Sequence, residues 1–151
     1  MKLATALSTR ADLQSRLNEL ETRLVANSKV QEGEKPDENP MELISEKDRI
    51  IAELETLISK INLTNSKTEA GGMTITELLA KRDCLKLDIK IMRNFLNSAS
   101  NKIHRLSRSE IVIKSTVNVA ELQKKVDALS KELREIDEKI QELNWTTELI
   151  G

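Results

Sequence analysis

The sequence predicts an all-α protein, an antiparallel four-helix bundle with long coiled-coil-like helices. Two observations lead to this prediction. Four long segments carry apolar residues at alternating spacings of four and three, which places them on one face of a helix. The chain also has only four glycines and two prolines, too few for a turn-rich all-β fold. Its 151 residues are the length of one domain, so we expect a single helical domain over residues 1–151. Two long hairpins that complete their core only in a dimer would explain the same pattern.

The first two expected helices cover about residues 3–28 and 41–66. Between them, Gly33 and Pro40 are typical of a helix end and a helix start. The apolar face of the first helix is formed by Leu13, Leu17, Leu20 and Leu24, and that of the second by Leu43, Ile50, Leu54, Leu57 and Ile61.

The other two expected helices cover about residues 76–106 and 119–144. The adjacent Gly71 and Gly72 favour a turn before the third helix. Asn118 is the expected N-cap of the fourth helix, with Glu121 three residues later as in a capping box. The apolar series is Leu78, Leu85, Ile89, Met92, Leu96, Ala99, Ile103 and Leu106 in the third helix, and Val119, Leu122, Val126, Leu129, Leu133, Ile136, Ile140 and Leu143 in the fourth.

One short segment between the third and fourth helices has the pattern of a strand. Residues 110–114 read Glu-Ile-Val-Ile-Lys, which is rich in β-branched side chains. A single strand needs a partner, and residues 28–32 lie at the same end of an up-down-up-down bundle. We therefore expect a small two-stranded β ribbon at that end.

The composition excludes several classes of function. The chain has one cysteine and one histidine, which cannot form an internal disulfide or a structural zinc site. Cys84 and His104 are separated by about 30 Å along one helix, so they cannot form a nucleophile–base pair within a protomer. The net charge of -1 argues against a nucleic-acid partner, because such proteins usually carry an excess of positive charge. We expect no enzyme activity, no cofactor and no metal.

The sequence also predicts no targeting or membrane segment. The apolar stretch at the N-terminus is interrupted by Arg10 and Asp12, and is too short for a signal peptide. No window approaches the roughly 20 apolar residues that span a bilayer. We expect a cytoplasmic protein in which Cys84 remains a thiol.

Several polar residues occupy or adjoin positions of the apolar series at one end of the expected bundle. Arg82, for example, lies between Leu78 and Leu85 in the third helix. Inward-facing polar groups need partners, because an unpaired buried group costs about 1–3 kcal/mol. The cluster is either a solvated salt-bridge network or a site for a small anion or polar ligand. Its members are Arg10, Asp12, Asn65, Arg82, Asp83, Asn144 and Trp145.

The third helix has a second apolar face. Leu87 lies about 200° around the helix from Leu85, so one core cannot bury both. An exposed apolar face of this kind usually marks an interface, and a two-fold dimer is the commonest closed solution. A bent bundle with loops over this face is the alternative. The expected interface of a homo-oligomer, a dimer or higher, consists of Ala80, Cys84, Leu87, Ile91 and Phe95.

Five short strings resemble a known family. They are residues 10–14, 29–33, 61–65, 107–111 and 144–147. Together they are similar to the septicolysin-like family of small bacterial proteins, a family of unknown function, and the resemblance covers essentially the whole chain. It implies a bacterial or phage source but no catalytic residue.

The residues favour a non-catalytic helical scaffold or interaction protein that self-associates. One alternative is a small-ligand binder at the end with Arg10, Asn65 and Arg82. A second is a membrane-active lysin, as the name of the similar family suggests. The mixed charge on the polar helix faces is unlike the basic faces of membrane-active helices.

Overall fold

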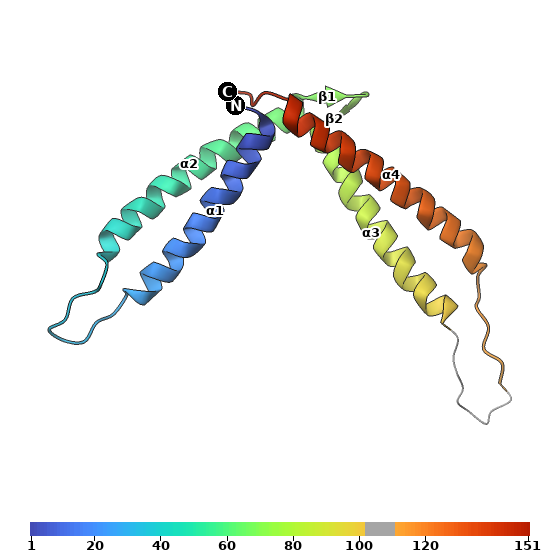
Figure 1. The fold of residues 1–151 in the computed structure, drawn as a ribbon, viewed down its shortest axis with the longest axis horizontal. Helices are drawn as coiled ribbons and strands as arrows, with labels where there is room; N and C mark the ends of the chain where they lie inside the picture. The colour runs from blue at the N-terminus through green and yellow to red at the C-terminus, as the bar shows by residue number, and fades with distance from the viewer. Residues whose placement is uncertain (102–110) are drawn as a thin grey trace. The chain divides into compact units, whose positions relative to one another are not determined.

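The computed structural model describes residues 1–101 and 111–151. It confirms the all-α class, with four long helices and one small antiparallel sheet (Figure 1). The expected helix bounds are close to the observed ones, except that residues 102–106 of the expected third helix lie outside the described residues. The elements are α1 (Leu3–Ala26), α2 (Pro40–Lys67), β1 (Glu69–Ala70), β2 (Met73–Thr74), α3 (Ile75–Ser100) and α4 (Val119–Thr146).

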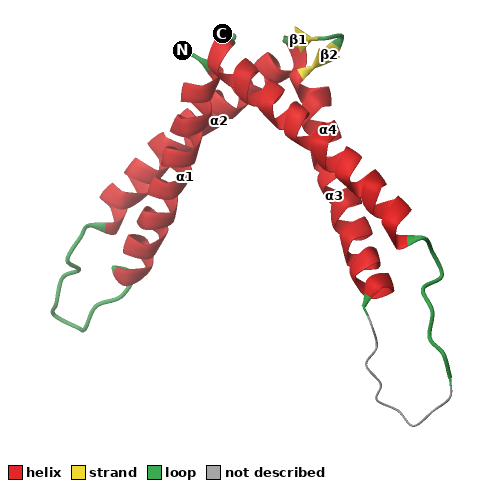
Figure 2. Ribbon diagram, turned by 45° about the vertical axis from the view of Figure 1, so that its right-hand side comes forward, coloured by secondary structure: helices red, strands yellow, loops and turns green. Residues whose placement is uncertain are grey.

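The chain divides into two compact units. The first consists of Met1–Ile75 together with Glu142–Gly151, and the second of Thr76–Gln141. In the first unit, α1 and α2 run antiparallel and side by side, and in the second, α3 and α4 do the same (Figure 2). Each unit is therefore built around a helical hairpin.

The core of the first unit is one seam between α1 and α2. Most of the buried side chains are seven residues apart, which is the repeat length of a coiled coil. About one residue in every two turns of each helix is therefore fully buried against the partner helix. Residues of the same series between them, such as Leu17 and Leu24, are half-buried. The buried residues of the seam are Leu3, Ala6, Leu13 and Leu20 from α1, and Leu43, Ile50, Leu57 and Ile61 from α2.

The connection between α1 and α2 is tied to both helices by polar contacts. Arg23 near the end of α1 donates from Nε to the two carboxylate oxygens of Glu38, at 3.0 and 3.2 Å. These hydrogen bonds lower the pKa of the Glu38 carboxyl from its usual value. Asn39 caps α2 by accepting from the backbone N–H of Met41, and Pro40 occupies the first turn. The helix start predicted at Pro40 is thus explained by two local signals.

The second unit has its core between α3 and α4. Ile89 and Leu96 of α3 and Val126 of α4 form a buried cluster. Arg93 donates to Ser130 at 3.2 Å across the same helix pair. The partly buried residues packed against this cluster are Met92, Val119, Leu122, Leu129 and Leu133.

The first turn of α4 has the predicted cap. Asn118 Oδ1 accepts from the backbone N–H of Glu121 at 3.1 Å, as expected for an N-cap residue.

The β ribbon is at a different place from the one predicted. Residues 28–32 and 111–114 form no strand, and residue 110 lies outside the described residues. The ribbon instead pairs Glu69 with Thr74 and Ala70 with Met73. The predicted turn at Gly71 and Gly72 closes it, because both residues adopt a positive φ that a two-residue hairpin turn requires. A local turn signal decides the position of the ribbon, whereas β-branched composition does not.

Candidate functional site

One exposed apolar surface of the second unit is a face of α3. We call Ala80, Cys84, Leu87, Ile91 and Phe95 the α3 stripe. All five residues are exposed, with Leu87 at 59%, Ile91 at 65% and Phe95 at 42%. Because the stripe lies on the side of α3 away from the buried core residues, three large apolar side chains meet water.

The core side of α3 explains why the stripe is left outside. Leu85, Ile89 and Leu96 are nearly fully buried, with exposures of 9%, 3% and 4%. Ile89 and Leu96 pack with Val126 of α4, and a two-helix seam can cover only one side of each helix. The second apolar series therefore has no cover within the hairpin formed by α3 and α4.

Charged side chains border the α3 stripe on both edges. Asp83 and Lys90 are two turns apart on one edge, and Lys81 and Asp88 are two turns apart on the other. All four are exposed. Within the chain, Lys81 lies 3.0 Å from Glu132 of α4, and Asp83 pairs with its neighbour Arg82.

The predicted polar cluster is divided between the two units. Arg82 is half-buried and donates to Asp83 Oδ1 from Nη2 at 3.1 Å and from Nε at 3.2 Å, both within the second unit. The other five residues belong to the first unit, and within the described part of the chain their side chains make no hydrogen bond or ion pair. They are Arg10 and Asp12 of α1, Asn65 of α2, and Asn144 and Trp145 of α4. A common ligand site for all seven remains a prediction.

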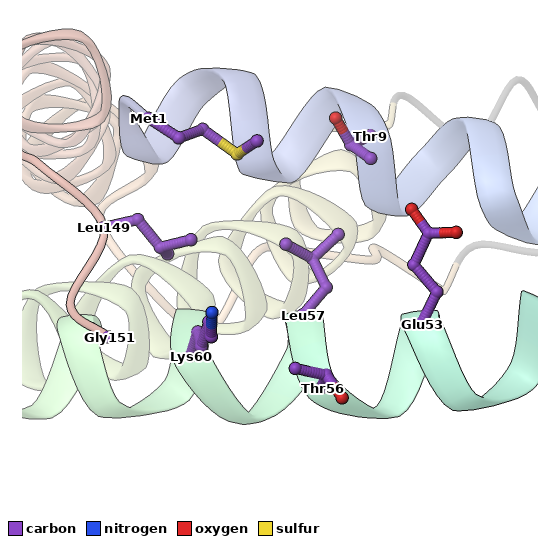
Figure 3. A pocket seen from close by; sticks show the side chains of 8 residues that line it. All are labelled: Met1, Thr9, Glu53, Thr56, Leu57, Lys60, Leu149 and Gly151. Carbon is purple, nitrogen blue, oxygen red and sulfur yellow. The ribbon is translucent and has the colours of Figure 1, made fainter.

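A pocket of about 430 Å³ opens in the first unit between α1, α2 and the C-terminal segment (Figure 3). Its polar side chains include Glu53 and Lys60 of α2, and Leu149 covers part of it. None of the predicted site residues lines it. Sequence periodicity gives no signal for this pocket, because part of its wall comes from the chain end beyond α4. The lining residues are Met1, Thr9, Glu53, Thr56, Leu57, Lys60, Leu149 and Gly151.

The C-terminal segment is held against the start of α1 by backbone hydrogen bonds. The N–H of Leu3 donates to the carbonyl of Thr147 at 2.9 Å, and the N–H of Leu149 donates to the carbonyl of Met1 at 2.8 Å. The first of these bonds satisfies an amide at the start of α1, where Lys2 provides no side-chain cap.

Two side chains strengthen this attachment. Lys2 Nζ lies 2.6 Å from Glu148 Oε1. The hydrogen bonds that Lys2 and the Met1 amino group donate to Glu148 lower the pKa of its carboxyl from the usual value. Thr64 is fully buried in α2, and its Oγ1 accepts from the N–H of Ile150 at 2.9 Å. The same hydroxyl donates to the carbonyl of Lys60, so it acts as donor and acceptor at once.

We predict that Thr64→Val lowers the free energy of unfolding by about 1–3 kcal/mol, because the partly buried N–H of Ile150 loses its acceptor. Urea unfolding followed by circular dichroism measures the change. Thr56→Val is the matched control, since the exposed Thr56 hydroxyl only donates to a carbonyl of its own helix. Equal effects of the two substitutions would contradict the role assigned to Thr64.

The described part of the chain contains neither a metal-binding cluster nor a membrane-spanning helix. Within residues 1–101 and 111–151, no group of three or more His, Cys, Asp or Glu side chains could hold a metal ion. In the same two ranges, no helix has the length and apolar character needed to cross a bilayer.

Comparison with known proteins gives a fold relative and a family. The chain is 40% identical to a functionally unknown conserved protein from Corynebacterium diphtheriae, whose crystal structure matches it with a TM-score of 0.90. The match covers 99% of each chain. No curated protein matches, and none of these comparisons supports the septicolysin-like name. A family model matches residues 10–149, and the chain therefore belongs to the family of unknown function DUF6847.

Proposed function

We propose that this protein is a non-catalytic cytoplasmic scaffold that self-associates through the α3 stripe. The observation that supports the proposal is the exposure of Leu87, Ile91 and Phe95 in a continuous row along one helix. Scattered single apolar residues are normal on protein surfaces, but a row at helical spacing forms a contiguous patch, and such patches usually mark interaction sites.

The energetic argument follows from apolar area. Moving a large apolar side chain fully out of water stabilises a complex by about 1.5–3 kcal/mol. In a symmetric pair, each stripe residue is buried in both copies, so its contribution counts twice. This gain is set against the cost of association, which is about 4–15 kcal/mol. Because Leu87, Ile91 and Phe95 are already partly covered in the chain, with exposures of 42–65%, the six side chains of a symmetric pair supply about half of the full value, which is comparable to the lower part of that cost.

The cytoplasmic part of the proposal rests on Cys84, which is exposed and lies within the stripe. A lone exposed thiol at an interface between copies would be prone to intermolecular oxidation in an oxidising compartment. The non-catalytic part rests on the sequence, which contains no phosphate loop, no Gly-rich dinucleotide turn and no serine nucleophile elbow.

Light scattering during size exclusion tests self-association directly. The wild-type chain should have a mass at least twice 17.1 kDa at micromolar concentration. Leu87→Glu combined with Phe95→Glu should lower the mass to that of the monomer, or unfold the chain if the folded state requires the partner. Both substitutions place a carboxylate inside the stripe, where an apolar contact cannot solvate it.

The matched control is Val25→Glu combined with Val30→Glu, which replaces two exposed apolar residues outside the stripe. This control should keep the wild-type mass, and circular dichroism should show the same helix content for all three proteins. A monomeric wild-type chain, or an equal loss of mass in the control, would refute the proposal.

The two alternatives predict different measurements. A ligand site near Arg10, Asn65 and Arg82 predicts thermal stabilisation by a ligand, about 2.7 kcal/mol at 100 times its Kd. A lysin predicts release of a dye from liposomes. The scaffold predicts neither result.

A further inference from the structure

We infer that two copies pack their α3 stripes against each other antiparallel, about a two-fold axis. The inference rests on the proposed self-association and adds its orientation and its charge contacts. It follows from the order of charges along the two edges of the stripe.

The two edges carry opposite charges in a fixed order. One edge has Asp83 followed, two turns later, by Lys90. The other edge has Lys81 followed, again two turns later, by Asp88. Each edge therefore contains one acid and one base separated by seven residues, the repeat length of a coiled coil.

In an antiparallel pair, each edge faces the same edge of the second copy with its residue order reversed. Asp83, which also pairs with Arg82 of its own chain, then meets Lys90 of the second copy, and Lys90 meets Asp83, so the edge is complementary to itself. The other edge likewise brings Lys81 to Asp88, although Lys81 is shared with Glu132 of its own chain. A single register satisfies both edges. The same register stacks Cys84 on Leu87 and Ala80 on Ile91 in the seam.

In a parallel pair, each edge faces the opposite edge in the same order. Asp83 then lies beside Asp88 of the second copy, and the two-fold axis repeats this contact. Like charges across an interface suppress the wrong pairing. The charges thus favour the antiparallel orientation and oppose the parallel one.

Asp83→Lys separates the two orientations, because its effect has opposite signs in them. In the antiparallel pair the new lysine faces Lys90 at two symmetric positions, and we expect the dimer dissociation constant to rise about tenfold at low salt. In a parallel pair it would face Asp88 and tighten the dimer. Analytical ultracentrifugation over a dilution series measures the constant.

Two further variants complete the cycle. Asp83→Lys with Lys90→Asp restores opposite charges, so the dissociation constant should return close to the wild-type value. Asp127→Lys makes the same charge change at an exposed position of α4 outside the stripe, and should leave the constant unchanged. Helix content by circular dichroism confirms that each variant is folded.

Disulfide trapping gives an independent measurement. Two chains lacking the native thiol, Ala80→Cys/Cys84→Ser and Ile91→Cys/Cys84→Ser, are mixed and oxidised. Antiparallel packing places position 80 of one copy opposite position 91 of the other, so only the mixed disulfide should form. The two copies of position 80, or of position 91, are about 16 Å apart along the helix axis, which is too far for a disulfide. Like-with-like disulfides, or a tighter dimer with Asp83→Lys, would overturn the orientation but leave self-association intact. A monomeric wild-type chain would overturn both.

Discussion

Replacing Ile61 with Ala should lower the free energy of unfolding by about 2–5 kcal/mol. Ile61 is fully buried in the seam between α1 and α2. Truncation removes apolar packing and leaves a cavity that two rigid helices cannot close completely. The loss of stability should appear as a lower urea midpoint with an unchanged slope, because the fold and the area exposed on unfolding remain the same.

The control for this prediction lies on the same helix. Ile51 is 46% exposed, so Ile51→Ala deletes the same atoms without opening a buried cavity. We expect a change of less than about 1 kcal/mol, since surface substitutions are usually small and Ala has the higher helix propensity. A loss at Ile61 no greater than that at Ile51 would contradict the assigned seam.

The helices can be predicted because their information is local and repeated. The four–three spacing of residues such as Leu13, Leu20, Val126 and Ile140 continues over many turns, and these residues are buried in the structure. A long periodic pattern outweighs a short competing one. Apolar and polar residues alternate from Leu85 to Ile91, which by itself would predict a strand, but these residues lie within α3.

The ribbon can be predicted only in part. The sequence predicts the turn at Gly71 and Gly72, but its β-branched side chains point to strands at residues 110–114 instead. A ribbon of two residues per strand depends on the turn geometry and on its attachment to the adjoining helices, such as the bond from the Ile75 N–H to the Thr68 carbonyl at 3.0 Å. Composition contains little information about pairing over so few residues.

The attachment of the C-terminal segment cannot be predicted from the sequence pattern. Thr64 interrupts the apolar pattern of α2 and resembles an ordinary polar surface residue, yet it is buried and accepts a hydrogen bond from Ile150. Its partner is far away in the sequence, so no periodicity relates the two. The same reason explains why the pocket beside Leu149 has no signal in the sequence.

The candidate site shows the same division between local and distant information. Angles around one helix predict the α3 stripe, and the structure places its residues on the surface. Arg82, at a polar position of the apolar series, pairs with the adjacent Asp83. The remaining members of the polar cluster come from different helices. Spacing within one helix does not give the distance between residues of different helices, so the sequence does not predict whether they meet.

The second large effect is expected at Ile89 in the other hairpin. Ile89 is 3% exposed and belongs to the cluster with Leu96 and Val126. Ile89→Ala should lower the free energy of unfolding by about 2–5 kcal/mol, for the same reason as at Ile61. The effect should be independent of protein concentration, because the side chains that pack around Ile89 belong to the same chain.

Ile91, two residues later on α3, is the matched position. It is 65% exposed within the chain and belongs to the α3 stripe. In dilute solution, where copies are separate, Ile91→Ala should change the free energy of unfolding by less than about 1 kcal/mol. At concentrations where the proposed dimer forms, the same substitution should cost more, because it also weakens the dimer, and dimer formation stabilises the folded chain. Urea unfolding of both variants at two protein concentrations measures these changes. A concentration-dependent loss at Ile89 with none at Ile91 would reverse the assignment of core and interface faces on α3.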